Sequence, residues 1–267
     1  MPIITLLTDF GLNDTFVGVM KGVIWSIAPD VKIVDLTHGI PPQNVMEAAL
    51  DIKDAAPYFP AGTIHVCVVD PGVGTSRRPM LAMMGGQYFV GPDNGLFSLL
   101  MDRAEDYTTA PVYVTLNKPR FWLPQISNSF HGRDIFAPVA AHLARGVPFE
   151  EMGDPFENPQ RLSIPHPVKT EEGWVGQVLR VDHFGNLVTN LTRTELDGCD
   201  GVMVTVKGKT LHGLSVTFGD QASGELIAML DSSGYLAVSL VNGSASDFLN
   251  ARSGEPVTLS FINGEGA

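Results

Sequence analysis

The sequence predicts an α/β domain with a mainly parallel sheet over residues 1–150, followed by an all-β, barrel-like domain over residues 171–267. Strand-like and helix-like segments alternate through the first part, which is typical of βαβ units. The second part has short β-type runs separated by Gly, Asp, Asn and Ser turns. Between the two, prolines at positions 148, 155, 159, 165 and 167 indicate an interdomain linker, placed at residues 151–170.

The first elements alternate between fully apolar strands and one-sided helices. A continuous apolar run at residues 3 to 9 predicts a strand buried on both faces. In residues 14 to 29, apolar side chains recur at helical spacing and form one face. A strand at 31 to 36, a helix at 44 to 56 and a strand at 63 to 70 continue the alternation. Ligands bind beyond the carboxyl ends of parallel strands, where Asp9 and Asp70 stand.

The remaining elements differ in type between the two domains. Residues 80–84, 87–91 and 112–116 are strand-like, and residues 133–146 predict a helix with Pro138 in or near its first turn. In the second domain, strands are expected at 174–182, 202–206, 225–230, 235–241 and 256–261, with no convincing helix of any length. This pattern favours a small barrel or a sandwich.

Charge and composition limit the kind of partner. The formal net charge of −12 would repel a polyanion, so we expect neither nucleic acid nor a membrane surface as partner, and a small or cationic ligand fits better. The N-terminus lacks a signal-peptide pattern and no stretch is long enough to span a bilayer, so a cytoplasmic location is expected. Cys67 and Cys199 are expected to be free thiols, with Cys67 a small buried residue.

The loop "VVDPGVGTSRRPM" at residues 68 to 80 places a carboxylate and guanidinium groups around a glycine-rich turn. It lacks the third glycine of a dinucleotide fingerprint and the Gly-Lys-Ser/Thr ending of a P-loop, so it is no recognised phosphate cradle. Asp70 and Arg77 could instead form a reactive pair. The alternative is a turn-capping Asp with Arg77 and Arg78 facing solvent.

The segment "SNSFHGRDIFAP" at residues 127 to 138 places His131 in a glycine-flanked loop just before a helix. A histidine there can titrate, although a structural, hydrogen-bonded histidine is the alternative. At the first strand end, the Asp9 carboxylate can accept hydrogen bonds from the two hydroxyls of a ribose. Asp14 can do the same or cap the following helix.

The second domain offers a group of nucleoside-binding side chains in "VDHFGNLVTN", residues 181 to 190. Asp182 can hold an ammonium, Phe184 can stack on a base, and the Asn186 amide can pair with an adenine edge. A hairpin turn built from Asp, Gly and Asn is the alternative. Ser232 could bind a carboxylate or make only a turn. The spacing of the histidines and cysteines predicts no metal site, and a nucleophilic serine motif is absent.

Seven motifs in order, "TDFG", "LTHGIPPQNV", "VVDPGVGTSRR", "GPDNGLF", "FHGRDIFAP", "DHFGN" and "SSGYL...VNGSA", resemble the S-adenosyl-L-methionine (SAM) hydroxide adenosyltransferases, relatives of the fluorinase and chlorinase. The resemblance runs from residue 3 to about residue 261. It implies that water splits SAM into adenosine and L-methionine without a metal or other cofactor. It also implies a homotrimer whose active sites form where the N-terminal domain of one subunit meets the C-terminal domain of a neighbour.

The resemblance also assigns roles to particular residues. It implies that Asp70, Arg77 and His131 position and activate the water, with Arg78 as the alternative arginine. Asp9 matches the ribose acceptor. The other matched positions are Asp182 and Ser232 for the methionine amino and carboxylate groups, and Asn186 and Phe218 for adenine. Halogenases carry tyrosine where this chain has Asp70 and His131, which favours water over halide; a halogenase or a non-catalytic SAM- or adenosine-binding module is the alternative.

Overall fold

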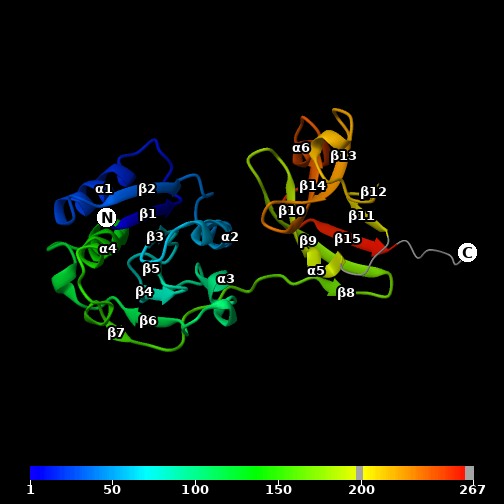
Figure 1. The fold of residues 1–267 in the computed structure, drawn as a ribbon. Helices are drawn as coiled ribbons and strands as arrows, with labels where there is room; N and C mark the ends of the chain where they lie inside the picture. The colour runs from blue at the N-terminus through cyan, green and yellow to red at the C-terminus, as the bar shows by residue number, and fades with distance from the viewer. Residues whose placement is uncertain (197–200, 262–267) are drawn as a thin grey trace, which may run out of the picture. The chain divides into compact units, whose positions relative to one another are not determined.

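The N-terminal half forms a mixed sheet of seven strands, in the order β2-β1-β3-β5-β4-β6-β7 (Figure 1). The computed structural model describes residues 1–196 and 201–261. The chain divides into two units, Met1–Ser163 and Ile164–Ala267. The strands of the first unit are β1 (Ile3–Thr8), β2 (Lys32–Thr37), β3 (Ile64–Val68), β4 (Pro79–Met84), β5 (Gln87–Pro92), β6 (Val112–Thr115) and β7 (Asp154–Pro155).

Parallel and antiparallel pairs occupy different halves of this sheet. β1 pairs in parallel with β2 and β3, and β3 pairs in parallel with β5. β4 is antiparallel to β5, because the two-residue turn Gly85–Gly86, with φ of 57° and 75°, returns the chain directly as a hairpin. On its other side β4 is antiparallel to β6. The predicted α/β class is confirmed, and the sheet is mixed because of this hairpin and the short strands beyond it.

Helices cover both faces of the sheet. The α-helices are α1 (Phe16–Ile27), α2 (Val45–Ala55), α3 (Ser98–Met101) and α4 (Ala137–Ala144), with a π-helical turn, Gly132–Phe136, ahead of α4. Short 3-10 turns lie at Ala56–Tyr58, Ala104–Asp106, Pro119–Phe121 and Phe149–Glu151. None of the helices in the described parts of the chain is both long and apolar enough to cross a bilayer.

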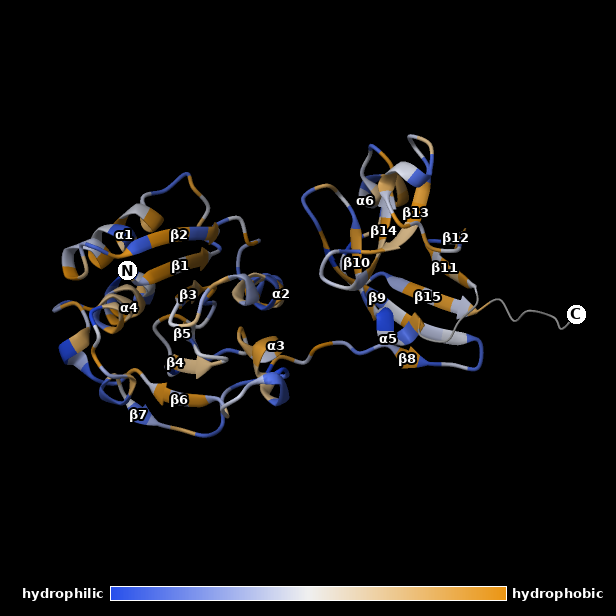
Figure 2. Cartoon of the chain, viewed as in Figure 1, coloured by the Kyte–Doolittle hydropathy of each residue, from blue (hydrophilic) through white to orange (hydrophobic). Residues whose placement is uncertain are grey.

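Two cores, one on each face of the sheet, account for the continuous apolar strands. Ile4 and Leu6 of β1 belong to the core under α1 and α4, whereas Leu7 joins the core under α2 and α3. Figure 2 shows the apolar residues of β1 and β6 in orange. Cys67 is fully buried in the second core, as predicted, and burial raises the pKa of its thiol. Cys199 lies outside the described residues.

The second unit is an antiparallel, nearly closed barrel-like sheet in the order β12-β11-β15-β9-β10-β14-β13, with β8 on β9. Its strands are β8 (Val168–Lys169), β9 (Gly173–Val181), β10 (Leu187–Thr192), β11 (Val202–Val206), β12 (Lys209–His212), β13 (Leu226–Leu230), β14 (Tyr235–Leu240) and β15 (Pro256–Phe261). Short helices α5 (Arg193–Leu196) and α6 (Ala245–Leu249) and the 3-10 turn Phe218–Asp220 complete it. The predicted all-β, barrel-like class is confirmed.

The division after Ser163 falls inside the segment 151–170 that the sequence assigns to a linker. The part before the division is tied to the first unit. The backbone N–H of Gln160 donates to Asp93 over 2.7 Å, and that of Leu162 donates to Ser98 over 2.8 Å. The exact bounds of the linker stay a prediction.

Candidate functional site

Asp9, Asp70 and His131 line one cavity of about 260 Å³ in the first unit. They come from three separate places: the loop after β1, the loop after β3 and the loop before the π-helical turn. β1 and β3 are neighbouring parallel strands, so their carboxyl ends deliver Asp9 and Asp70 to the same edge of the sheet. The other lining residues are Phe10, Gln43, Val68, Pro71, Val73, Ser129, Phe130 and Gly132.

Asp70 and Arg77 form a bidentate ion pair. Arg77 Nε donates to Asp70 Oδ1 over 3.0 Å, and Arg77 Nη2 donates to Oδ2. The two side chains are only 5% and 7% exposed, so Arg77 does not face solvent. Burial raises the pKa of the Asp70 carboxyl, although the charge and hydrogen bonds of Arg77 oppose this effect. The pair therefore places an ionisable and almost fully buried carboxylate at the cavity.

Arg78, the next residue, has a different set of contacts. Its Nε donates to Asp93 over 2.8 Å, and its Nη2 donates to the Asn158 carbonyl over 2.6 Å. The guanidinium also lies over the ring of Phe156, 4.2 Å from its centroid. Arg78 thus ties the segment after β7 to the first unit, and Arg77 is the arginine beside Asp70.

Arg77 also fixes the protonation of His131. Its Nη2 lies 3.1 Å from Nδ1 of His131. A guanidinium can only donate, so Nδ1 accepts and the imidazole carries its proton on Nε2. Burial, and then the charge of Arg77, lower the pKa of His131, while Asp70 and Asp134 act in the opposite direction. The imidazole is therefore held in its neutral form.

A close contact between two loops holds this cluster together. Gly74 has φ of +76°, and a Cβ at this position would lie 2.1 Å from the carbonyl oxygen of Asn128. Only glycine fits there, because both the backbone conformation and the available space exclude a side chain. The loop that carries Asp70 is thereby seated against the loop that carries His131.

Asp134 stabilises the loop that carries His131 through hydrogen bonds to Ser127. Its carboxylate is fully buried and accepts hydrogen bonds from the N–H and hydroxyl of Ser127, each over 2.8 Å. The Ser127 hydroxyl in turn accepts from the N–H of Phe130. This role of Asp134 could not be read from the sequence, because the Ser127 contact follows only from the folded loop.

The Asp9 carboxylate is oriented by the loop before α2. Its Oδ2 accepts the backbone N–H of Gln43 over 2.8 Å, and Gln43 has a left-handed φ of 64°. The role of Gln43 rests on its backbone N–H, and the motif "LTHGIPPQNV" around it is the only sequence signal for it. Asp14 is exposed, and Thr15 rather than Asp14 occupies the N-cap position of α1.

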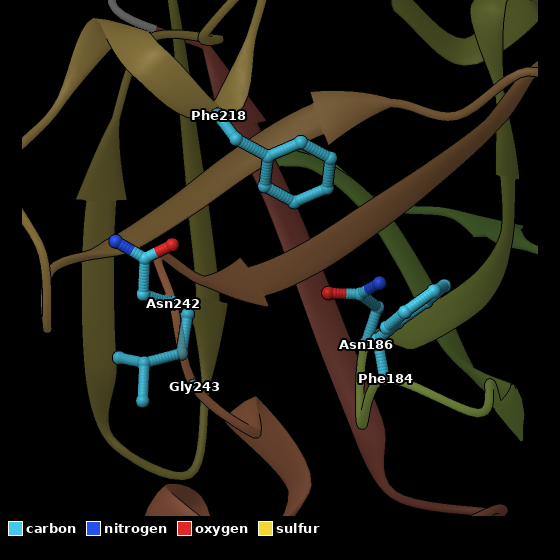
Figure 3. Close-up of a pocket in the computed structure, with 6 residues that line it drawn as sticks. Phe184, Asn186, Phe218, Asn242 and Gly243 are labelled. Carbon is cyan, nitrogen blue, oxygen red and sulfur yellow. The ribbon is translucent and has the colours of Figure 1, made fainter.

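The second unit carries a cavity of about 400 Å³ lined by Phe184, Asn186, Phe218, Leu240, Asn242 and Gly243 (Figure 3). Phe184 and Phe218 are 74% and 46% exposed, so both rings offer open faces. Figure 3 shows Asn186 beside Phe184, with Phe218 and Asn242 coming from other loops. Three predicted adenine-binding residues thus share one cavity, and Asn242 is a polar lining residue that sequence reasoning missed.

Asp182 and Ser232 do not belong to the lining set of this cavity. Asp182 Oδ1 accepts the N–H groups of Phe184 and Asn186, both over 2.9 Å, and Oδ2 accepts the Asn186 amide over 2.7 Å. These bonds build the hairpin turn that was the alternative for this segment. Ser232 is exposed in a turn whose N–H groups are bound by Asp231.

The described residues hold no group of three or more His, Cys, Asp or Glu side chains that could bind a metal ion. The first cavity and the residues in contact with it bring together four polar side chains. These are a buried carboxylate, a guanidinium that orients it, a neutral imidazole and a second carboxylate. This set can orient a water molecule, accept its proton and bind a diol.

Comparison with known proteins identifies the family. Residues 4–153 match the SAM hydroxide adenosyltransferase N-terminal domain, and residues 176–258 match its C-terminal domain. The (R)-S-adenosyl-L-methionine hydrolase of Thermus thermophilus is 41% identical over 95% of this chain and 97% of its own length. The hydrolase of the same name from Salinispora arenicola is 38% identical over 97% of this chain and 98% of its own.

More distant relatives and a solved structure are also similar to nearly the whole chain. Fluorinases are 28% to 30% identical to the chain. The crystal structure of an uncharacterized conserved protein from Thermotoga maritima has a TM-score of 0.87 at 38% identity, and the match covers 96% of this chain and 99% of that one. Both family domains and the near full-length relatives lead to one conclusion: the chain belongs to the SAM hydroxide adenosyltransferase family.

Proposed function

We propose that this chain is an (R)-S-adenosyl-L-methionine hydrolase, which uses water to split SAM into adenosine and L-methionine. The observation that carries the proposal is that Asp70 and His131 line the same cavity as Asp9, with Arg77 behind them in contact with both. The names of the near full-length relatives support the substrate. No metal or other cofactor is part of the proposal.

The chemistry of the substrate explains why such a small set of residues suffices. In SAM, the ribose C5′ is bonded to a positively charged sulfonium, which leaves as a neutral thioether and needs no proton. A bond forms between the water oxygen and C5′ while the C5′–S electron pair moves to sulfur. Positive charge disperses in this step, so a water-poor cavity favours the transition state. The remaining task is to align one weak nucleophile opposite the sulfur.

The geometry suggests one division of roles among the three residues. Asp70 accepts the proton of the attacking water, because the N–H of Arg77 already occupies the Nδ1 lone pair of His131. His131 donates a hydrogen bond from Nε2 to the same water. Arg77 holds the Asp70 carboxylate and favours its ionised form. General-base help of this kind is worth about 10²- to 10⁴-fold, so alignment and desolvation supply the rest.

Binding of the substrate is assigned to both domains. Asp9 accepts hydrogen bonds from the ribose hydroxyls, whose position beside the reacting C5′ suits the cavity that Asp9 shares with Asp70. Phe184, Phe218 and Asn186 bind the adenine, since their cavity offers two exposed rings and an amide. Asp182 and Ser232 are assigned to the methionine amino and carboxylate groups by family resemblance alone.

The family resemblance also supports an assembly, and the cytoplasmic location stays an expectation from the sequence. The proposal is a homotrimer in the cytoplasm, with neighbouring copies contributing to each active site. Sedimentation-velocity analysis of the purified chain tests the assembly, and a single species with the mass of three chains is expected. A monomer that turns over SAM at full rate would contradict it.

The proposed reaction is tested by product analysis in oxygen-18 water. Incubation of the purified chain with SAM should give methionine and adenosine labelled at the 5′ oxygen. Parallel incubations with chloride and fluoride should give no 5′-halo-5′-deoxyadenosine. A halogenated product would identify a halogenase, and SAM that stays bound and intact would identify a binding module; either result would overturn the proposal.

A further inference from the structure

A row of contacting side chains joins β2 and the turn after it to Thr8 of β1, the residue before Asp9, and the proposed reaction does not use this row. Lys21 Nζ donates to Asp35 Oδ2 over 2.6 Å, and Asp35 Oδ1 lies 3.0 Å from Nε2 of His38. On the other side of the ring, Nδ1 of His38 lies 2.8 Å from Oγ1 of Thr8. Thr8 is fully buried and His38 is 5% exposed, so these groups depend on one another for hydrogen bonds.

An irregularity in strand pairing accompanies this arrangement. β1 and β2 are in regular parallel register as far as Leu6, which pairs with Asp35, but Leu7 then pairs with Thr37. The extra residue in β2 forms a bulge, a feature that re-aims side chains near functional sites. The bulge lies between Asp35 of β2 and His38 of the turn that follows β2, and these two residues contact each other.

The hydrogen atoms of this row can be assigned from the donors present. The N–H of Phe10 donates to Thr8 Oγ1, so the Thr8 hydroxyl can donate its own hydrogen to Nδ1 of His38. The imidazole proton then sits on Nε2 and faces Asp35. Burial raises the pKa of the Asp35 carboxyl, but hydrogen bonds from Lys21 and His38 outweigh burial and hold the pKa below its usual value. The two ring nitrogens of His38 therefore each face a polar side chain, Thr8 on one side and Asp35 on the other.

His38 holds the chain on both sides of Asp9. Its side chain bonds Thr8, the residue before Asp9, and its carbonyl oxygen accepts the N–H of Gly11 over 2.8 Å. The loop that follows His38 supplies the Gln43 N–H, which binds the Asp9 carboxylate itself. His38 thus bonds the residue before Asp9 and a residue shortly after it. The loop that follows His38 bonds the Asp9 carboxylate itself.

We propose that His38 is a positioning residue that fixes the Asp9 carboxylate for the ribose diol, with Asp35 fixing the His38 ring. This inference rests on the proposed role of Asp9 in the proposed hydrolase. It predicts that loss of the His38 ring harms the recognition of the ribose hydroxyls in particular. A residue with only a structural role would instead weaken the binding of every nucleoside alike.

The test compares two nucleosides that differ only in the groups Asp9 binds. Isothermal titration of the full-length chain gives the dissociation constants of adenosine and of 2′,3′-dideoxyadenosine, which lacks both hydroxyls. The unaltered chain should prefer adenosine by about tenfold or more, as expected for hydrogen bonds to a charged group. In His38→Leu this preference should fall toward one, with little change for dideoxyadenosine. His38→Asn keeps an oxygen near the Nδ1 position and should retain most of the preference.

A matched control is His65 of β3, which bonds a threonine of β1 as His38 does. His65 is also fully buried, and its Nδ1 bonds Oγ1 of Thr5 over 2.8 Å, but Thr5 lies in the middle of β1. His65→Leu should lower the melting temperature and leave the preference for adenosine unchanged. If His38→Leu does not fold, Asp35→Ala replaces it, because the Asp35 side chain is 40% exposed and its removal leaves the core intact.

The outcomes separate this inference from the proposed function. A reduced preference in His38→Leu or Asp35→Ala, with the preference of His65→Leu intact, supports the inference. An unchanged preference in the His38 and Asp35 variants would overturn it and leave the role of Asp9 standing. An unaltered chain that binds both nucleosides equally would overturn the role of Asp9 and the inference together.

Discussion

Nη2 of Arg77 lies 3.1 Å from Nδ1 of His131, and the same nitrogen donates to the carboxylate of Asp70. One guanidinium therefore sets the protonation of two groups. It favours the ionised form of Asp70 by its charge, and it favours the neutral imidazole of His131 by occupying Nδ1. The cavity then offers one proton acceptor and one hydrogen-bond donor to a water molecule.

Asp70→Asn is expected to lower single-turnover hydrolysis by about 10²- to 10⁴-fold, because the amide keeps the shape of the carboxylate but cannot accept a proton. The affinity for SAM, measured by isothermal titration, should change little. Asp93→Asn is the matched control, since Asp93 is a buried partner of Arg78 outside the cavity. The assigned role of Asp70 is wrong if its variant hydrolyses SAM at the parent rate.

The pH dependence of turnover should distinguish Arg77 from Arg78. Asp70 must be ionised to accept a proton, and Arg77 opposes the rise in its pKa that burial causes. Without that charge, the pKa of Asp70 rises further and the carboxyl stays protonated to higher pH. Arg77→Met should therefore move the acid limb of the kcat/KM profile to higher pH, whereas Arg78→Met should leave that limb in place. Equal profiles for the two variants would contradict this account.

Gly74→Ala tests the contact between the two loops of the site. The positive φ alone should cost about 1 to 2 kcal/mol, and the overlap with the Asn128 carbonyl adds to this cost. We expect a lower melting temperature and a lower kcat, because the loops carrying Asp70 and His131 must move apart. Gly62→Ala isolates the backbone effect, since Gly62 has φ of +81° and open space around it. A loss of kcat as large in Gly62→Ala would exclude the loop contact as the cause.

Asp9→Ala should weaken the affinity for adenosine by about tenfold or more through the loss of hydrogen bonds to the ribose hydroxyls. The rate of the chemical step in saturating SAM should change far less. Asp14→Ala serves as the control, because Asp14 is exposed in the loop before α1. An unchanged dissociation constant in Asp9→Ala would show that the diol is bound elsewhere.

The fold was predictable because local patterns determine most of it. β1 is apolar at successive positions, and the structure divides those side chains between two cores. The helical spacing in residues 14 to 29 likewise matches α1. The sheet became mixed where a two-residue Gly85–Gly86 turn made a hairpin, which the glycine pair alone could have indicated.

The site was predictable in its residue types but not in its contacts. Arg77 and Arg78 are adjacent in sequence, and only the fold directs one to Asp70 and the other to Asp93. The fit of Gly74 against Asn128 joins segments that are distant in sequence, so no local pattern reports it. The oxygens of Asp182 bond the turn that presents Asn186, a contact that the sequence did not reveal, and its role toward an ammonium stays a prediction.

The stereochemistry at C5′ tests the central claim most directly, because a direct attack by water and a covalent aspartyl intermediate differ there. SAM carrying deuterium in one of the two positions at C5′ would be hydrolysed by the purified chain, and the configuration of the product adenosine determined by NMR. One in-line displacement by water predicts inversion at C5′. Retention would contradict the account, because it requires two successive displacements and a bond between the substrate carbon and the protein.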